Sequence, residues 1–338
     1  MSAPLVRVGL VGLGTMGGIM ARALLAQGHE VWGHDPVVRL RQRWARAGVR
    51  TPGSNAEVAR HADVLLVSLP GSGALRSVVR EWAEAPPPRP GQIVIETSTV
   101  ALQDKVWAAA ELKGQGRVML DAPISGTATP TPETTWIMYL SGPVAACRQA
   151  ARLVRAFTLS APRVGPLGSG IKLKMAANHL VAVYNVACAE MVTLCRAMGL
   201  DPQVALQHMG HSPYIGTGLM RLRMPMMIRR EYQPATMKIA LWQKDMQVIG
   251  DMARTALCPT PLLNTCAAVY TSAMAQGLGE HDTAAVAEVL GLPRAKPKVP
   301  SLAGAAPQLS PAPAAPPTRA RSSAASAGAA PPRAARRR

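Results

Sequence analysis

The chain has 338 residues, of which 48% are hydrophobic and 17% charged, which is enough apolar material for two folded domains. This composition excludes a small disulfide-stapled module and a wholly disordered protein. The formal net charge is +18, but nine basic residues and no acidic residue lie in 293–338, whereas residues 1–292 carry 28 basic against 19 acidic groups. The folded part is therefore only moderately basic, and its charge does not require nucleic-acid binding.

Neither membrane insertion nor a metal site is expected from the sequence. No run approaches the roughly 18 consecutive apolar residues of a membrane span, and the N-terminus enters an apolar strand without a basic leader. The only close histidine pair, His208 and His211, lacks a third ligand. The five cysteines form no CxxC pair, and Cys188 and Cys195 share one face of a predicted helix. We therefore expect a soluble cytoplasmic protein with free, mostly buried thiols.

Short β-rich runs alternate with helix-length segments from Val6 to about residue 165, the pattern of a sheet wrapped by helices. The runs are VRVGLVG at 6–12, HEVWGHD at 29–35, ADVLLVSLP at 62–70, GQIVIETST at 91–99, VMLDAP at 118–123 and TWIMYLSG at 135–142. Their almost continuous hydrophobicity is typical of parallel strands covered on both faces. We predict an α/β domain with a doubly wound, mostly parallel sheet over 1–166.

The second half of the chain has helical character. Residues 171–199 are the clearest helix, and Asp201-Pro202 opens the next one. Beyond Leu292 the chain is low in complexity, with 10 Pro and 15 Ala among 46 residues. We predict an all-α domain over 167–292 and a disordered basic tail over 293–338.

A GxGxxG motif directly follows the first predicted strand and opens the first helix. In this context the first glycine permits a tight turn, the second lets a pyrophosphate approach the backbone, and the third allows close packing of helix and strand. The phosphates then face the free N–H groups of the helix N-terminus. The loop predicted to bind a dinucleotide consists of Gly12, Leu13, Gly14, Thr15, Met16 and Gly17.

Asp35 ends the second strand, 23 residues after Gly12. A carboxylate at this position accepts hydrogen bonds from the adenosine ribose and repels a 2′-phosphate, so it favours NAD over NADP. An Asp that merely begins a turn with Pro36 is the alternative. Because Arg39, Arg41 and Arg43 follow closely, NADP stays possible as the cofactor.

Four segments in order resemble the β-hydroxyacid dehydrogenase family, which includes 3-hydroxyisobutyrate dehydrogenase and tartronate semialdehyde reductase. They are GLVGLGTMGGIMARALLAQGHEVWGHD at 9–35, DAPISGT at 121–127, GSGIKLKMAANHL at 168–180 and WQKDM at 242–246. The resemblance covers residues 5–292. It implies a Rossmann domain, a long interdomain helix, an all-α domain, an active site between the two domains, and homodimers or homotetramers built through the helical domain.

The resemblance places the family's catalytic lysine at Lys174, with Asn178 orienting it and bonding the substrate oxygen. The two residues are four apart, so they project from one helix face, whereas Lys172 points elsewhere and is expected to face solvent. Hydride transfer at a carbon that bears a hydroxyl needs a proton acceptor or donor at that oxygen. Oxidation needs Lys174 neutral, so desolvation or a neighbouring cation must lower its pKa, and Lys244 is the candidate cation.

The resemblance further implies that Ser125, Gly126, Thr127 and Lys244 hold a substrate carboxylate, while Leu69, Pro70, Ser98 and Thr99 lie beside the cofactor. Lys244 paired with Asp245 at the surface is the alternative for that segment. Asp282 matches an acidic position that we interpret as structural. The sequence departs from the family at Thr127, where a glycine is usual, at Pro130 and Pro132, and at Met237, where an aromatic is usual.

These features predict an NAD(P)-dependent oxidoreductase acting on a small 3-hydroxy acid or the corresponding semialdehyde. An imine reductase shares the architecture but usually lacks a lysine at the catalytic position. A catalytically idle dehydrogenase domain with a basic tail that binds nucleic acid or an acidic partner is the alternative from another class.

Overall fold

The computed structural model describes residues 5–85, 90–126 and 136–291. Thr127, the segment with Pro130 and Pro132, and the tail 293–338 lie outside the described residues. The predictions made for them therefore stay predictions.

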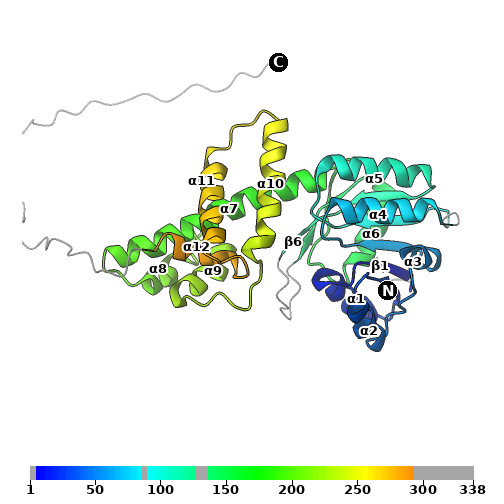
Figure 1. The fold of residues 1–338 in the computed structure, drawn as a ribbon, viewed down its shortest axis with the longest axis horizontal. Coiled ribbons are helices and arrows are strands. Elements are labelled where there is room, and N and C mark those ends of the chain that lie inside the picture. Colours follow the sequence, from blue (N-terminus) through cyan, green and yellow to red (C-terminus); the bar gives the residue numbers. More distant parts are fainter. Residues whose placement is uncertain (1–4, 86–89, 127–135, 292–338) are drawn as a thin grey trace, which may run out of the picture. The chain divides into compact units, whose positions relative to one another are not determined.

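The first half alternates strands and helices, as the hydrophobic runs predict (Figure 1). Its strands are β1 (Arg7–Val11), β2 (Glu30–His34), β3 (Val64–Val67), β4 (Ile93–Glu96), β5 (Val118–Asp121), β6 (Ile124–Ser125), β7 (Ile137–Met138), β8 (Leu140–Ser141) and β9 (Arg163–Gly165). Its helices are α1 (Thr15–Ala26), α2 (Val38–Arg46), α3 (Asn55–His61), α4 (Ser72–Ala83), α5 (Leu102–Gly114) and α6 (Val144–Val154).

The main sheet has the strand order β2-β1-β3-β4-β5-β8-β9 within the described residues. From β2 to β5 every neighbouring pair is parallel, so the carboxyl ends of these strands meet along one edge. Strand order reverses between β1 and β3, because β2 lies on one side of β1 and β3 on the other. Such a switch point leaves a crevice at the carboxyl edge where a ligand can bind.

The last predicted run, at 135–142, forms two strands rather than one. β7 pairs antiparallel with β6 in a separate small sheet, whereas β8 joins β5 antiparallel and β9 parallel in the main sheet. Continuous hydrophobicity marks such a segment as buried, but it does not reveal where a strand changes partners. The short strand β9 carries no such run and was not predicted.

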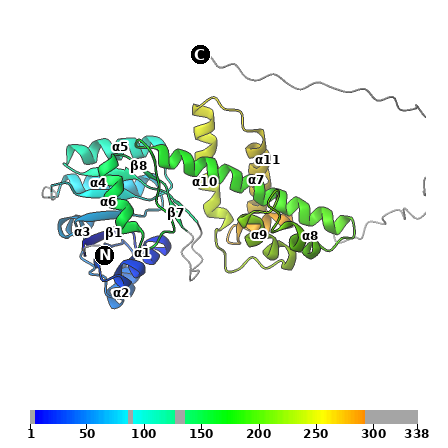
Figure 2. The same cartoon turned by 180° about the vertical axis from the view of Figure 1, so that it is seen from behind.

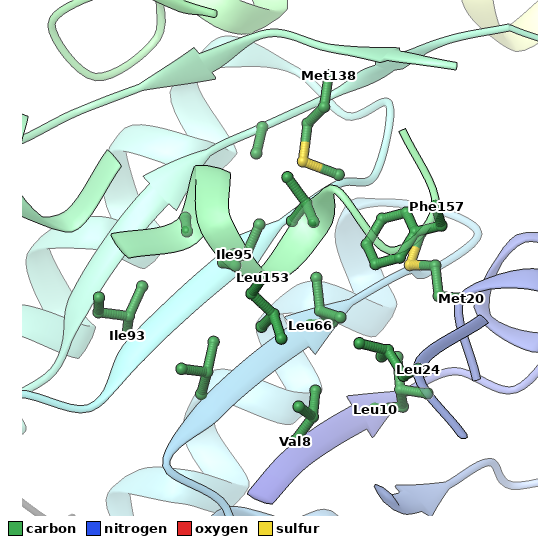
Figure 3. Close-up of a cluster of buried hydrophobic side chains, with 14 of the residues drawn as sticks. Val8, Leu10, Met20, Leu24, Leu66, Ile93, Ile95, Met138, Leu153 and Phe157 are labelled. Atoms are coloured by element: carbon green, nitrogen blue, oxygen red, sulfur yellow. The ribbon is translucent and has the colours of Figure 1, made fainter. Parts of the chain in front are cut away.

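Alternating strand residues bury two hydrophobic clusters, one on each face of the sheet. Val8, Leu10, Leu66 and Ile95 face α1 and α6, as Figure 3 shows for Leu24 of α1 and Leu153 of α6. Leu65, Val67 and Val94 face the opposite way, against α3, α4 and α5. The prediction of a doubly wound sheet is therefore confirmed.

The second half is helical, as predicted. It consists of α7 (Ser169–Ala197), α8 (Pro202–Met209), α9 (Gly218–Arg229), α10 (Ile239–Thr255), α11 (Pro261–Ala275), the 3₁₀ turn η1 (Thr283–Ala285) and α12 (Val286–Val289). Asp201 caps α8 by accepting a hydrogen bond from the Gln203 backbone N–H, and Pro202 takes the first helical position. The shorter helices pack against α7, with α10 crossing its N-terminal half at Asn178 (Figures 1 and 2).

The thiols are free, and four of the five are buried, as expected. Cys188 and Cys195 both face the interior from α7. Burial raises the pKa of the Cys188 thiol to about 11, so this thiol stays protonated near neutral pH and acts as a small apolar side chain.

Candidate functional site

The glycine motif forms the turn between β1 and α1, and each glycine has a distinct environment. Gly12 has a φ of +93°, and a Cβ there would strike the Ser68 carbonyl oxygen. A Cβ on Gly17 would strike the Gly12 carbonyl oxygen, whereas a Cβ on Gly14 would meet no atom within 4 Å. Gly12 and Gly17 are therefore required by close backbone packing, whereas Gly14 leaves open space at the N-terminus of α1.

Helix α1 starts directly behind this loop. Its N-cap is Gly14, and no side chain caps its first turn. The first N–H groups of the helix are thus available to an anion, and the helix dipole favours negative charge at the same point. The loop therefore fits the pyrophosphate of a dinucleotide cofactor.

Asp35 lies at the end of β2 and is only 8% exposed. One carboxylate oxygen accepts the Leu13 backbone N–H at 2.9 Å, and the other accepts the Val37 N–H at 2.9 Å. The side chain therefore fastens the glycine loop to the β2–α2 turn, which is the turn role offered as an alternative. The remaining lone pairs of a carboxylate leave capacity for a ribose hydroxyl.

A cavity of about 700 Å³ opens at the carboxyl edge of the sheet. Its volume is in the usual range for cofactor and small-molecule pockets. The predicted residues that line it are Gly12, Gly14, Thr15, Met16, Asp35, Leu69, Pro70, Thr99 and Lys244. Met237, Leu241 and Asp245 of the helical half line it as well.

Three predicted cofactor residues lie behind the lining rather than in it. Gly17 packs against the Gly12 carbonyl, and Leu13 is fully buried. Ser98 is 5% exposed, and its hydroxyl accepts the Leu69 backbone N–H at 2.8 Å. Ser98 thus supports the loop that carries Leu69, while its neighbour Thr99 faces the cavity.

Lys174 and Asn178 project inward from the same face of α7, as their spacing predicts. Lys174 is 9% exposed and Asn178 is 4% exposed, whereas Lys172 faces solvent. The Asn178 amide donates a hydrogen bond of 2.9 Å to the Asp245 carboxylate on α10. Because Asp245 also lines the cavity, this bond joins the buried pair on α7 to the cavity wall.

Burial sets the proton affinity of this group. It lowers the pKa of Lys174 below its ordinary value of 10.5, and the Asp245 carboxylate opposes that shift. Burial also raises the pKa of Asp245, against the effect of Lys244, Lys174 and the Asn178 amide. Of the two causes expected for a lowered pKa of Lys174, desolvation is the one that acts, whereas the charge that acts on Lys174 is an anion and not the candidate cation Lys244.

Lys244 extends toward the first half of the chain. Its ammonium donates a hydrogen bond of 3.2 Å to the Pro70 carbonyl oxygen, and among the described residues it forms no ion pair. The alternative of a plain surface pair with Asp245 does not hold, because Asp245 is 5% exposed and bonded to Asn178.

Ser125 and Gly126 lie apart from the cavity lining. Ser125 ends β6, paired with Ile137 of β7, and Gly126 has a φ of +149° with the Trp136 ring directly beside it. In the part of the chain that the structure describes, no hydrogen bond joins either residue to Lys174 or Lys244. Their carboxylate-binding role therefore stays a prediction, as does that of Thr127.

The buried acid Asp245 and a buried ion cluster of Lys105, Glu96 and Asp121 were not predicted from the sequence. A signal existed for Asp245, because Trp242, Asp245, Met246 and Ile249 recur at the spacing of one helix face and all are buried. Glu96 and Asp121 end adjacent strands whose other residues are apolar, which places both acids at the carboxyl edge. Among the described residues no cluster of three potential metal ligands occurs.

Two sequence families match the chain in the order of its two halves. The NAD binding domain of 6-phosphogluconate dehydrogenase matches residues 7–165. The NAD-binding domain of NADP-dependent 3-hydroxyisobutyrate dehydrogenase matches residues 168–290.

Characterised relatives match almost over their full length. An L-threonate dehydrogenase from Cupriavidus necator is 30% identical over 284 residues, which is 83% of this chain and 95% of that protein. A 3-sulfolactaldehyde reductase from Escherichia coli is 27% identical, over 83% of this chain and 94% of that protein. The solved structure of Mycobacterium tuberculosis 3-hydroxyisobutyrate dehydrogenase with L-serine is 25% identical, with a TM-score of 0.77, over 86% of this chain and 100% of that chain.

An imine reductase from a Pseudomonas species shares the fold at a greater distance. It is 16% identical with a TM-score of 0.57, over 85% of this chain and 100% of that chain. This likeness is one of fold alone. The hydroxyacid dehydrogenases therefore match better in both sequence and structure.

Proposed function

The chain belongs to the β-hydroxyacid dehydrogenase family of NAD(P)-dependent oxidoreductases, and on that premise we propose that Lys174 is the general acid and base of its hydride-transfer reaction. One observation supports this proposal above all. Lys174 is buried on α7 and has a lowered pKa, and it lies one helical turn from Asn178, whose amide is bonded to Asp245 in the cavity lining. An exposed lysine would stay protonated at neutral pH and would not serve as a base.

The nicotinamide cofactor, when bound, supplies the group that accepts or donates the hydride. Gly12 to Gly17 would hold its pyrophosphate and Asp35 its ribose, with Leu69, Pro70, Ser98 and Thr99 beside the remainder. In oxidation the neutral Lys174 amine takes the proton of the substrate hydroxyl while the carbon that bears this hydroxyl loses its hydride. In reduction the Lys174 ammonium returns that proton to the carbonyl oxygen.

Asn178 and Asp245 control the orientation and charge of this group. Asp245 accepts the Asn178 N–H, so the amide oxygen of Asn178 is free to accept a hydrogen bond from the Lys174 ammonium or from the substrate hydroxyl. The negative charge of Asp245 opposes the fall in the pKa of Lys174 that burial causes.

The substrate is a small molecule that carries a carboxylate, held by Lys244 with Ser125, Gly126 and Thr127. Lys244 lines the cavity without an ion-pair partner among the described residues, and an ammonium in that state favours an anion. Two relatives are named for L-threonate, which carries a carboxylate, and for 3-sulfolactaldehyde, which carries a sulfonate, so both names describe small anions.

A second copy of the chain packs against α7 in this proposal. Exposed or half-exposed apolar residues recur along one face of α7 at alternating steps of four and three, the spacing of a coiled-coil seam. They are Leu173, Ala177, Leu180, Tyr184, Ala187, Met191 and Leu194, and the series continues to Met198 at the C-cap. Leu180→Glu should therefore halve the molar mass measured by light scattering, and an unchanged mass would remove this face as the interface.

The enzyme acts in the cytoplasm in this proposal, consistent with five unpaired thiols. Helix α7 is long and apolar enough to cross a membrane by composition, but 39% of its most apolar window is buried against the rest of the chain. Recovery in the soluble fraction of lysed cells supports this location, and recovery in washed membranes contradicts it.

The direct test measures initial rates of NAD and NADP reduction with a panel of 3-hydroxy acids that includes 3-hydroxyisobutyrate, glycerate and L-threonate. We expect one acid to be oxidised, with a loss of about 10²- to 10⁴-fold in Lys174→Ala. The exposed neighbour provides a matched control, because Lys172→Ala should keep the wild-type rate. Equal rates in Lys174→Ala and wild type would overturn the assignment, and turnover of a cyclic imine with no turnover of any acid would favour an imine reductase.

A further inference from the structure

Lys105 is a fully buried lysine in the sheet domain, away from the group around Lys174. It lies on the inward face of α5 at 0% exposure, between two carboxylates that are also 0% exposed. Its ammonium is 2.6 Å from Oε2 of Glu96 at the end of β4 and 2.7 Å from Oδ1 of Asp121 at the end of β5. The two carboxyl ends of neighbouring strands are thus joined through one positive charge.

The Asp121 carboxylate continues this network into the start of α7. Its second oxygen accepts the Ile171 backbone N–H at 2.8 Å and the Ser141 hydroxyl at 3.0 Å. The Ser141 oxygen in turn accepts the Gly170 N–H at 3.0 Å. Two N–H groups in the first turn of α7 are therefore fixed to the sheet, and Lys174 follows one turn later on the same helix.

The Glu96 carboxylate continues the network toward the cofactor cavity. Its other oxygen accepts the Ser98 backbone N–H at 2.8 Å, and the Ser98 hydroxyl accepts the Leu69 N–H at 2.8 Å. Leu69 and Thr99, which follows Ser98, both line the cavity. The loops after β3 and β4 are thereby connected through Glu96 to the same buried ammonium.

We propose that Lys105 is a positioning residue, which fixes the N-terminus of α7, and with it Lys174, relative to the two loops that line the cofactor cavity. The inference rests on the proposed function, because the group it positions is the proposed acid and base. Lys105 itself touches neither the cavity nor Lys174 and acts through Glu96 and Asp121.

A lysine is required here because two buried carboxylates need a counter-charge. Burial alone would lower the pKa of Lys105, but Glu96 and Asp121 outweigh burial and raise it above 10.5, so the ammonium persists across the working pH range. With an uncharged side chain at this position, the two acids would repel each other or share a proton. Such a site gains a pH dependence that the wild-type site lacks.

The test compares Lys105→Met with Gln92→Met, a matched loss of a buried polar group. Gln92 is 1% exposed in the same domain, but it precedes β4 at the opposite edge of the sheet and bonds the Ala59 and Ala62 carbonyls. Both variants should lose thermal stability. At a temperature where both are folded, kcat should fall about 10- to 100-fold in Lys105→Met and little in Gln92→Met.

Two further readouts separate positioning from general destabilisation. The KM for the cofactor should change less than kcat in Lys105→Met, because the network reaches only the loops after β3 and β4, whereas the glycine loop and Asp35, which would hold the pyrophosphate and the ribose, lie outside it. The ratio of kcat in Lys105→Met to kcat in wild type should fall as pH rises and the unpaired acids ionise. Wild-type kcat in Lys105→Met, or an equal loss in Gln92→Met, would overturn the inference.

A milder variant covers the case in which Lys105→Met does not fold. Ser141→Ala removes only the hydroxyl that bonds Asp121 and the Gly170 N–H, and it should lower kcat with little change in cofactor KM. An unchanged kcat in Ser141→Ala would then overturn the inference. Failure of the proposed function is distinguishable, because it appears as wild-type protein that oxidises no acid or as full activity in Lys174→Ala.

Discussion

The two halves of the chain contribute to the cavity by different means. The sheet domain offers mainly backbone, with the glycine loop and the uncapped first turn of α1 at the switch point. The helical half offers polar side chains: Lys244 and Asp245 of α10 line the cavity, and Asn178 of α7, one turn from the buried Lys174, is bonded to Asp245 behind the lining. A phosphate is recognised well by N–H groups and a dipole, whereas a proton transfer needs a titratable side chain whose surroundings set its pKa.

The two halves also differ in how their buried charged groups are used. In the helical half, Asp282 accepts hydrogen bonds from the Ala284 and Thr236 backbone N–H groups and pairs with Arg223, which is 3% exposed. This agrees with the structural role expected for Asp282. In the sheet domain, the Lys105 cluster bonds segments of the site itself.

The largest effect on stability is expected from Asp282→Ala, which leaves the Arg223 guanidinium buried without a counter-charge. The free energy of unfolding should fall by about 3–5 kcal/mol, measured by urea denaturation at pH 7. Burial alone would raise the pKa of Asp282, but Arg223 and the hydrogen bonds from Ala284 and Thr236 outweigh it and hold the pKa below 3.8.

The sign of the pH dependence follows from that lowered pKa. The carboxylate contributes its full stabilisation above pH 3.8, the ordinary value for Asp, and loses it as pH falls through the lower folded-state pKa. The difference between wild type and Asp282→Ala should therefore shrink in strongly acidic solution. A constant difference down to pH 2 would show that the carboxylate charge is not the source of the stabilisation.

Gly14→Ala tests whether the sheet domain binds the cofactor through the exposed backbone of its glycine loop. Because a Cβ at Gly14 meets no protein atom within 4 Å, the variant should unfold at nearly the wild-type temperature. The added methyl group lies where a pyrophosphate would approach, so the KM for the cofactor should rise about tenfold or more, with a smaller change in kcat. Equal cofactor KM values in the variant and wild type would contradict the assignment of this loop. Gly73→Ala, on the first turn of α4 with the same free space, is the matched control and should change neither quantity.

Asp245→Asn tests the effect of the Asp245 charge on the pKa of Lys174. Of the substitutions other than the controls, it should change the maximal rate or the stability least. The Asn side chain still accepts the Asn178 N–H, but the anion that raises the pKa of Lys174 is lost. The pKa of Lys174 should fall, and the pH profile for oxidation should shift toward lower pH. A shift toward higher pH would contradict the inferred role of Asp245.

The same contrast explains what the sequence could and could not predict. The glycine motif, its flanking strand and helix, and Asp35 lie within 30 residues of one another, so local patterns describe them fully. The pairing of Asn178 with Asp245 spans 67 residues, and the contact of Asp121 with Ile171 spans 50. Spacing within one helix or strand predicts that such a side chain is buried, but it does not predict which distant residue the side chain contacts.

Two details depend on long-range contacts in the same way. Desolvation or a neighbouring cation was expected to lower the pKa of Lys174, with Lys244 as the candidate cation; desolvation lowers it, and the charge that acts on Lys174 is the Asp245 carboxylate. The run at 135–142 was expected as one strand, although β7 and β8 pair in different sheets. In both cases the sequence indicated burial correctly, and long-range pairing decided the contacts.

The most direct test of Lys174 as acid and base is the pH dependence of kcat/KM measured in both reaction directions on the same hydroxy acid and its oxidised form. Oxidation needs the neutral amine, so its rate should rise with pH through a pKa below 10.5 and then level off, whereas reduction should fall through the same pKa. Both limbs should vanish in Lys174→Ala. Profiles that keep the same inflection in Lys174→Ala would contradict the account, because another group would then carry the proton.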